Sequence, residues 1–446
     1  MSMIALRAAC GLALATALGG AAPATYTLSE TGQAGDCYQV HIELDLKGEM
    51  RVSREGQQQT LKLAAQAEHR FAERVLVIDR GVIHKAARAY ETAKATITQG
   101  QEKLERSLRP ERRLIVAQES GGQALVYAPA GAMTSDEIEL TGEQFDTLSL
   151  PGLLPARAVA LGEKWKPAAD VVQYLCSFEG LTGHNLECKL LAVNDQVARI
   201  ALSGTANGID LGAIVKLEIQ ANAEFDMKAN RLVSLEWKQK DERGQGPASP
   251  AMTVESTTKV TRTLISQPAS LTDVAIISVP DGLDPPAGMT QVSAHFECKT
   301  PFDLSCARDW QIVAQTSDHL VLRLLDRGDF VAQATITPWD SAKPGQHLTP
   351  EAFREAMNKT KGWEVGDIAE ETEVPSDKVA SDTGRWLYRI QESGKMDGLK
   401  VVQTFYLLAS PTGEQIVLAF TMTPQQVGKV GGRDLALIRG LEFCHK

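Results

Sequence analysis

Long stretches of the sequence alternate between apolar and polar residues, a pattern that suits β-strands with one buried face. The clearest stretch is 215–225, where apolar residues stand at every odd position and Lys, Glu, Gln or Asn stand between them. A period of two residues matches a strand and excludes a helix. Similar patterns at 38–46 and 252–264 predict further strands, and a turn at 226–230 predicts another strand from Arg231. Half-buried strands joined by short turns are typical of antiparallel sheet.

A few segments of the first half predict helices instead. Apolar residues spaced by three and four positions predict a helix over 83–108. The capping-box spacing of Thr134 and Glu137 predicts a short helix that follows. Pro167 predicts the start of another helix, with Val171 and Leu175 on its apolar side.

Residues 265–290 interrupt the strand pattern. Proline and glycine concentrate at 279–288, and few residues there are suited to a core. We therefore expect a linker over 265–290 that separates a first domain (25–264) from a second (291–446).

The second domain has consecutive strands with helices between groups of them. Strands are predicted near 302–306, 319–325, 330–337, 386–391, 401–409 and 415–421. The residues 410–414 suit a hairpin turn, and helices are predicted from Pro350 to about Lys361 and over 433–439. The expected fold class is α+β: a curved antiparallel sheet with helices on one side, then an antiparallel α/β/α sandwich.

The first twenty-four residues have the features of a secretory signal peptide. Arg7 is their one charge, residues 8–18 are apolar, and 22–24 form an A-x-A cleavage site. We therefore predict a periplasmic or secreted protein. The apolar stretch is shorter than the about 20 residues that span a bilayer, so no transmembrane segment is expected in the mature chain. A formal charge of −10 without a basic cluster argues against nucleic acid as a partner.

Outside the cytoplasm, cysteines can form disulfides. The mature chain has six candidates: Cys37, Cys176, Cys188, Cys298, Cys306 and Cys444. We expect Cys176 to pair with Cys188, and Cys298 or Cys306 to pair with Cys444. Cys37 would then pair with the remaining cysteine or stay free.

The sequence contains no recognisable catalytic or cofactor motif. Histidines with zinc-helix spacing, C-x-x-C pairs, a G-x-S-x-G elbow and a phosphate-binding glycine loop are all missing. His295 and Cys298 are close in sequence, but two possible ligands at the end of one strand make a poor metal site. We therefore expect both residues to have a structural role. We therefore assign no catalytic residue, metal or cofactor.

Two resemblances to known families follow from short motifs. Leu153-Leu154-Pro155, Gly162-Glu163-Lys164-Trp165 and the run 203–208 resemble secreted bacterial proteins of the planctomycete type. Proteins of this type resemble the LolA/LppX-like lipoprotein carriers, which form an incomplete barrel with helices on its concave side. The segment of this chain that shares the resemblance covers about residues 36–264. That resemblance implies an apolar cavity for acyl chains.

The second half of the chain, about residues 291–446, is similar to the PsbP-like domain. The similarity lies in Phe302-Asp303-Leu304, the strands at 405–408 and 416–420, and the end at 441–443. This second resemblance implies an interaction module, mostly without catalysis.

These observations lead to three hypotheses of different classes. The leading one is a non-enzymatic extracytoplasmic binding protein for an apolar ligand, such as a lipid, or for a cell-envelope component. The second is a structural or assembly protein of the envelope that contacts another envelope protein and binds no small ligand. The third is a secreted hydrolase whose paired carboxylates cannot be recognised by spacing.

Overall fold

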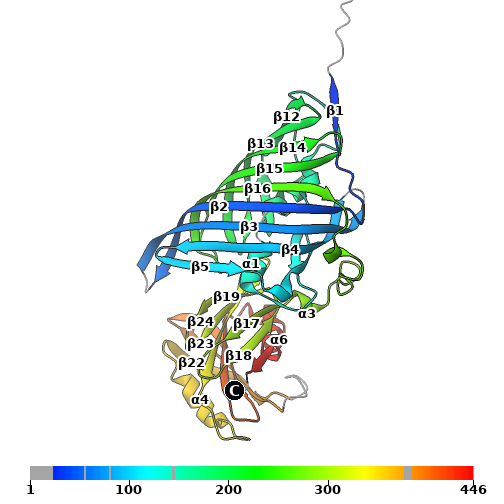
Figure 1. Cartoon of the computed structure of the whole chain (residues 1–446). Coiled ribbons are helices and arrows are strands. Elements are labelled where there is room, and N and C mark those ends of the chain that lie inside the picture. Colours follow the sequence, from blue (N-terminus) through cyan, green and yellow to red (C-terminus); the bar gives the residue numbers. More distant parts are fainter. Residues whose placement is uncertain (1–23, 55–56, 80–81, 143–145, 376–383, 445–446) are drawn as a thin grey trace, which may run out of the picture.

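A computed structural model describes residues 24–54, 57–79, 82–142, 146–375 and 384–444. All but the last residue of the predicted signal peptide therefore lies outside the described residues. Antiparallel sheets with a few short helices make up this structure, which confirms the expected α+β class. Figure 1 shows a large curved sheet with the C-terminal part below it, and α1 and α3 lie near the boundary.

In the described chain the large sheet has thirteen strands in the order β10-β12-β13-β14-β15-β16-β2-β3-β4-β6-β7, with β11 beside β13 and β5 beside β4. The bounds are β2 (Cys37–Arg54), β3 (Gln57–Asp79), β4 (Val82–Gln99), β5 (Glu102–Ser107), β6 (Leu114–Ser120), β7 (Gln123–Tyr127), β10 (Lys164–Trp165), β11 (Gly180–His184), β12 (Glu187–Asn194), β13 (Val197–Asp210), β14 (Ala213–Asp226), β15 (Arg231–Arg243) and β16 (Ala251–Ile265). Along β14, buried residues alternate with residues that face outward. The strands predicted at 38–46, at 215–225, from Arg231 and at 252–264 are confirmed as β2, β14, β15 and β16.

The helix predicted over 83–108 is wrong, because this segment forms β4 and β5. Gly100, with φ +62°, lies in the turn between the two strands. β4 pairs with β3 on one side and with β5 and β6 on the other. Its residues 85–88 are buried on both faces of the sheet, so apolar and polar positions do not alternate there. The sequence therefore lacked the period that identifies a half-buried strand.

Short elements fill the inner face of the large sheet. The 3-10 helix η2 (Leu150–Leu153) and α2 (Ala169–Leu175) pack there, with β1 (Thr25–Leu28) paired to β9 (Arg157–Ala160). α2 confirms the helix expected after Pro167. We call 146–156 the inner segment, because Leu148 and Leu150 are buried in this core.

The residues after β16 run along the opposite, outer face of the same sheet. Leu271, in the 3-10 helix η3 (Ala269–Leu271), is fully buried against Ala72 and Ala87. The Lys85 ammonium donates to the carbonyls of Pro280 and Gly282 at 2.5 and 2.6 Å. The 265–290 segment, expected to have little to bury, therefore covers β3 and β4 before α3 (Ala287–Thr290) begins.

The C-terminal part is built on a seven-stranded sheet in the order β19-β20-β21-β25-β24-β23-β22 within the described residues. The bounds are β19 (Trp310–Gln315), β20 (Leu320–Asp326), β21 (Asp329–Trp339), β22 (Trp363–Glu373), β23 (Trp386–Met396), β24 (Leu399–Ala409) and β25 (Gln415–Met422). Its central strands are buried on both faces, as in a sandwich. Phe405 faces α4 (Pro350–Asn358), whereas Tyr406 faces the side that holds α6 (Arg433–Arg439).

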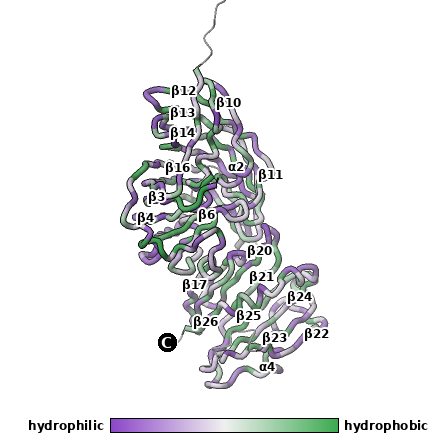
Figure 2. Tube along the Cα trace, turned by 90° about the vertical axis from the view of Figure 1, so that its right-hand side faces the viewer, coloured by the Kyte–Doolittle hydropathy of each residue, from purple (hydrophilic) through white to green (hydrophobic). Residues whose placement is uncertain are grey.

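A small sheet joins the two parts. It has the order β26-β18-β17-β8, from β26 (Leu441–Phe443), β18 (Phe302–Cys306), β17 (Val292–Phe296) and β8 (Met133–Thr134). The pairing of β17 with β8 is parallel and connects residues of the two parts. Figure 2 shows β20 and β21 near the N-terminal part and α4 at the far end.

Candidate functional site

The N-terminal part has a cavity of about 670 Å³ at one end of its inner face. Five segments that are distant in sequence form it: the residues after β1, the start of β4, the end of β6, the inner segment and α2. Its lining is Ser29, Glu30, Thr31, Val82, Ile83, Glu119, Gly122, Leu148, Ser149, Pro151, Gly152, Leu154, Ala156, Asp170, Val171, Gln173 and Tyr174. This volume lies within the range of roughly 300–1,000 Å³ that is typical of small-molecule sites.

Apolar side chains cover the floor of this cavity. Ile83, Leu148 and Leu154 are buried and belong to the main core, and Val171 packs against that core from α2. Val82, at the start of β4, is 53 % exposed. An apolar molecule in the cavity would cover such surface, which is worth about 25 cal/mol per Å² removed from water.

The charged residues of the cavity lining are all acidic. Glu30 accepts from Arg262 at 3.0 Å and from the Leu232 amide at 3.0 Å, so its charge is compensated inside the protein. Glu119 lies 2.7 Å from His84 Nδ1, and Asp170 is exposed. No Lys, Arg or His is among the lining residues of the described chain. The cavity therefore favours a neutral or cationic ligand over an anionic one.

Tyr174 lines the cavity, and its hydroxyl is buried without a hydrogen-bond partner among the described residues. Burial, and then the charge of Asp146, raises the pKa of this hydroxyl. The group therefore stays neutral and contributes an aromatic wall rather than an acid or base.

A buried ionic cluster holds the inner segment against the sheet. The Arg88 guanidinium on β4 donates to Glu73 at 2.9 Å and to Asp146 at 3.0 Å, and all three side chains are buried. Thr147 also donates to Glu73, at 2.5 Å. Burial alone would lower the pKa of Arg88, but Asp146 and Glu73 raise it. The wall of the cavity is thereby fixed to β3 and β4.

Elsewhere the inner face of the described chain is packed with buried apolar side chains. Small voids of about 10 Å³ each lie there between the inner segment and strands β12 to β16. Two larger grooves, of about 580 and 610 Å³, lie on the polar faces of the strands. Their charges pair between neighbouring strands, as between Lys94 and Glu68 at 2.8 Å. These grooves therefore have the character of a solvated surface.

The expected disulfides are absent from the described chain, whose six cysteines are all free thiols. Cys176 ends α2, and Cys188 on β12 lies 3.7 Å from the Leu153 carbonyl. Cys306 is buried in the C-terminal core, and Cys37 and Cys298 each point to a backbone carbonyl two residues away. Burial raises the pKa of Cys176, Cys188 and Cys306 to about 12, so these thiols are protonated and unreactive.

Cys444 instead lies beside His295 and Asp303 on the small sheet. One ligand atom from each of these residues lies within 4.8 Å of the other two. Sequence reasoning considered His295 with Cys298 and missed this group. The missing information was the strand register, because β17, β18 and β26 come from both ends of the C-terminal part.

A second group of carboxylates lies near the junction of the two parts. Arg243 lies 2.6 Å from Asp210 and 3.6 Å from Asp241. Burial raises the pKa of both carboxyl groups, and Arg243 counteracts it. None of the cavities described above is lined by these residues, so they have the character of a structural ion cluster.

Neither a family model nor a curated protein matches the chain. Among solved structures, a Bacteroides thetaiotaomicron protein is 13 % identical and covers 32 % of this chain and 46 % of its own, with a TM-score of 0.21. The translocator domain of the autotransporter NalP from Neisseria meningitidis is 7 % identical over 88 % of this chain and 89 % of its own, with a TM-score of 0.14. Salmonella typhi OmpF in complex with daunomycin is 8 % identical over 88 % and 99 %, with a TM-score of 0.13. Such low TM-scores support no argument about fold or function.

No helix in the described part of the chain is long and apolar enough to cross a membrane.

Proposed function

We propose that this protein is a non-enzymatic extracytoplasmic binding protein whose ligand occupies the cavity beside α2. The observation that carries the proposal is the cavity itself, with its apolar floor and a lining without basic residues. Its ligand is an apolar molecule with a neutral or cationic polar end. The predicted signal peptide supports the extracytoplasmic location.

The packed inner face limits the size of this ligand. A carrier that encloses several acyl chains needs a hollow sheet, whereas here the inner segment and α2 occupy that space. The proposal is therefore one small ligand held at the end of the sheet. The resemblance to lipoprotein carriers remains a prediction, as do the assembly and hydrolase alternatives.

The experiment measures binding of the neutral apolar dye N-phenyl-naphthylamine by its fluorescence. The variant Val171→Trp places a large side chain in the cavity from α2, and Ser149→Trp does so from the inner segment. Each is expected to weaken dye binding at least about tenfold, or about 1.4 kcal/mol. Ala169→Trp, at an exposed position on the same helix and outside the lining, is the matched control.

Two results would reject the proposal. One is the absence of saturable dye binding to the wild-type chain. The other is equal affinity in the two cavity variants and the control, with folding of each verified by circular dichroism. Because the two variants reach the cavity from different segments, misfolding of one leaves the other as a test.

A further inference from the structure

Three side chains of different metal-binding types meet on the exposed face of the small sheet. His295 on β17 lies directly opposite Asp303 on β18. Cys444 follows β26, which pairs with the other edge of β18. Its amide donates to the Pro301 carbonyl at 2.9 Å and extends that pairing by one residue. Side chains directly opposite or diagonal across strands lie within contact distance, which explains the convergence.

The opposite face of this sheet is firmly packed. Phe296, Phe302 and Leu441 are buried in the C-terminal core, and Phe443 packs against it. The strands that carry His295, Asp303 and the approach to Cys444 are thereby held in place. A site on rigid elements keeps its donor atoms in position without a bound ligand.

The imidazole of His295 lies between two carboxylates. Its Nδ1 is 2.8 Å from Asp303 Oδ1, and its Nε2 is 3.0 Å from Glu297 Oε2. A neutral imidazole has one N–H and can donate to only one of these groups. The Nδ1 of His295, the Asp303 carboxylate and the Cys444 sulfur face the same place, where Asp303 is within hydrogen-bond distance of the other two groups. A divalent cation at that place replaces the protons that these groups share, because metal binding requires deprotonated ligand atoms.

We propose that His295 Nδ1, Asp303 and Cys444 bind one divalent transition-metal ion, with zinc as the best match. Nitrogen and sulfur donors select zinc-type ions over Mg²⁺ and Ca²⁺, which require oxygen ligands. Three protein ligands leave a fourth tetrahedral position for water. Glu297 is a positioning residue that orients the imidazole through Nε2, as carboxylates do around many zinc-bound histidines. The ion ties the end of the chain to β17 and β18.

The test is titration of the full, reduced chain with Co²⁺, which reports thiolate coordination by a charge-transfer absorption. The wild-type chain is expected to bind one equivalent and to show this absorption. Cys444→Ser abolishes the absorption, and His295→Gln and Asp303→Asn each weaken binding at least about tenfold. Glu297→Gln weakens binding by about 10–100-fold and retains the absorption.

Two control variants separate this site from its neighbours. Cys298→Ser removes a second, partly exposed thiol near the small sheet, and His445→Gln removes the imidazole next to Cys444 in sequence. Both are expected to bind Co²⁺ as the wild-type chain does. The proposal fails if no stoichiometric binding occurs, if Cys444→Ser keeps the absorption, or if either control abolishes it. The metal proposal can fail while the cavity proposal holds, and the reverse, because Co²⁺ binding and dye binding are measured separately.

Discussion

His69 is a buried histidine at the centre of the N-terminal part. Its side chain is 1 % exposed, packs edge-on against Tyr90 with ring centroids 6.0 Å apart, and leaves Nε2 without a hydrogen-bond partner among the described residues. Burial, and then the positive charge of Arg88, lowers the pKa of His69 from 6.5 to about 4. The native protein therefore holds this imidazole neutral in mildly acidic solution.

This depressed pKa predicts a loss of stability in acid. Between pH 6.5 and about 4 the unfolded chain binds a proton at His69 that the folded chain does not. The free energy of unfolding therefore falls with decreasing pH, by about 3 kcal/mol from this residue across the interval. Urea unfolding of the wild-type chain and of His69→Leu, compared at pH 6.5 and near pH 4, measures the difference.

Between pH 6.5 and about 4, the free energy of unfolding of His69→Leu is expected to fall by about 3 kcal/mol less than that of the wild-type chain. His319→Gln, in the C-terminal part, serves as the control and is expected to keep the wild-type pH dependence. Identical pH dependence in His69→Leu and the wild-type chain would show that His69 does not cause the effect.

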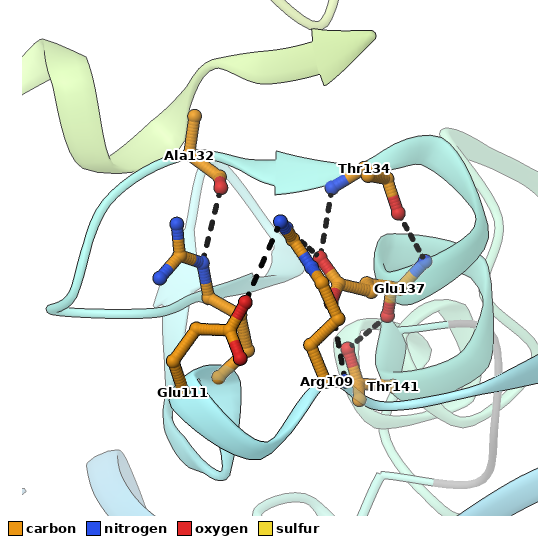
Figure 3. A network of polar contacts seen from close by, with 7 residues as sticks. Arg109, Glu111, Ala132, Thr134, Glu137 and Thr141 are labelled. Atoms are coloured by element: carbon orange, nitrogen blue, oxygen red, sulfur yellow. Dashed lines mark hydrogen bonds and ion pairs between the residues drawn. The ribbon is translucent and has the colours of Figure 1, made fainter. Parts of the chain in front are cut away.

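At the scale of single elements, α1 (Ser135–Gly142) shows how a short helix is secured (Figure 3). The Thr134 hydroxyl accepts from the Glu137 amide at 3.2 Å, and Glu137 accepts from the Thr134 amide at 3.0 Å. This is the capping box that the sequence predicted. Arg109 adds hydrogen bonds of 2.6 and 2.7 Å to the same carboxylate, which joins the helix to the end of β5.

Glu137 predicts a second pH effect, which acts in a lower range. Burial alone would raise the pKa of Glu137, but the hydrogen bonds from Arg109 and Thr134 lower it below its ordinary value of 4.5. The charged form therefore stabilises the fold above pH 4.5, and this contribution is lost as the pH falls through the depressed value. Glu137→Gln is expected to lower the free energy of unfolding by about 2 kcal/mol at neutral pH.

Urea unfolding at pH 7 and at about pH 3.5 measures this effect. The difference between Glu137→Gln and the wild-type chain is expected to shrink at the lower pH. Glu111→Gln is the control, because Glu111 is exposed and lies 3.8 Å from Arg109. A difference that does not change with pH would contradict the role of the charged carboxylate.

The sequence predicted well those strands that have one buried face and one exposed face. β14 and β16 show that pattern directly, and the Pro-Gly turn after β24 was equally clear. β4 was missed because residues 265–290 cover one of its faces and the inner core covers the other. No local pattern records such a two-sided burial.

The candidate cavity was beyond local prediction for a similar reason. A concave apolar site was expected from a resemblance, but its residues come from segments separated by more than one hundred positions, such as Thr31 and Val171. The disulfide prediction failed because cysteine count and compartment do not give distances between Sγ atoms. Cys306, for example, is buried in the C-terminal core and is not bonded to Cys298, which packs against the same core.

At the scale of the whole molecule, turns from the two parts meet closely. A Cβ on Gly212, in the β13–β14 turn, would lie 2.2 Å from the Gly328 carbonyl in the β20–β21 turn. Arg323 donates to the Pro247 carbonyl, and Arg308 donates to the Val126 carbonyl at 2.6 Å. Together with the β8–β17 pairing, these contacts fix the two parts relative to each other.

Gly212→Ala is therefore expected to weaken the junction. A methyl group at this position must push the two turns apart. Gly398→Ala is the matched control, because Gly398 has φ +82° in a turn but nothing within 4 Å of its added Cβ. The control is expected to cost about 1 kcal/mol for the left-handed backbone. Gly212→Ala, with φ +72°, is expected to cost about 1–2 kcal/mol more.

Urea unfolding gives these free energies, and limited proteolysis of both variants reports whether the junction opens. Cleavage between the two parts is expected to accelerate in Gly212→Ala alone. Equal stability and equal cleavage in the two variants would show that the contact between the turns contributes nothing.

The most direct test of a ligand in the cavity is native mass spectrometry of the chain purified from the cells that naturally produce it. The wild-type protein is predicted to carry one bound molecule, apolar with a neutral or cationic end, that is released by organic solvent. Val171→Trp purified in parallel is predicted to lack it, and Ala169→Trp to retain it. A wild-type protein without any bound molecule, or a molecule retained equally by Val171→Trp, would contradict the account.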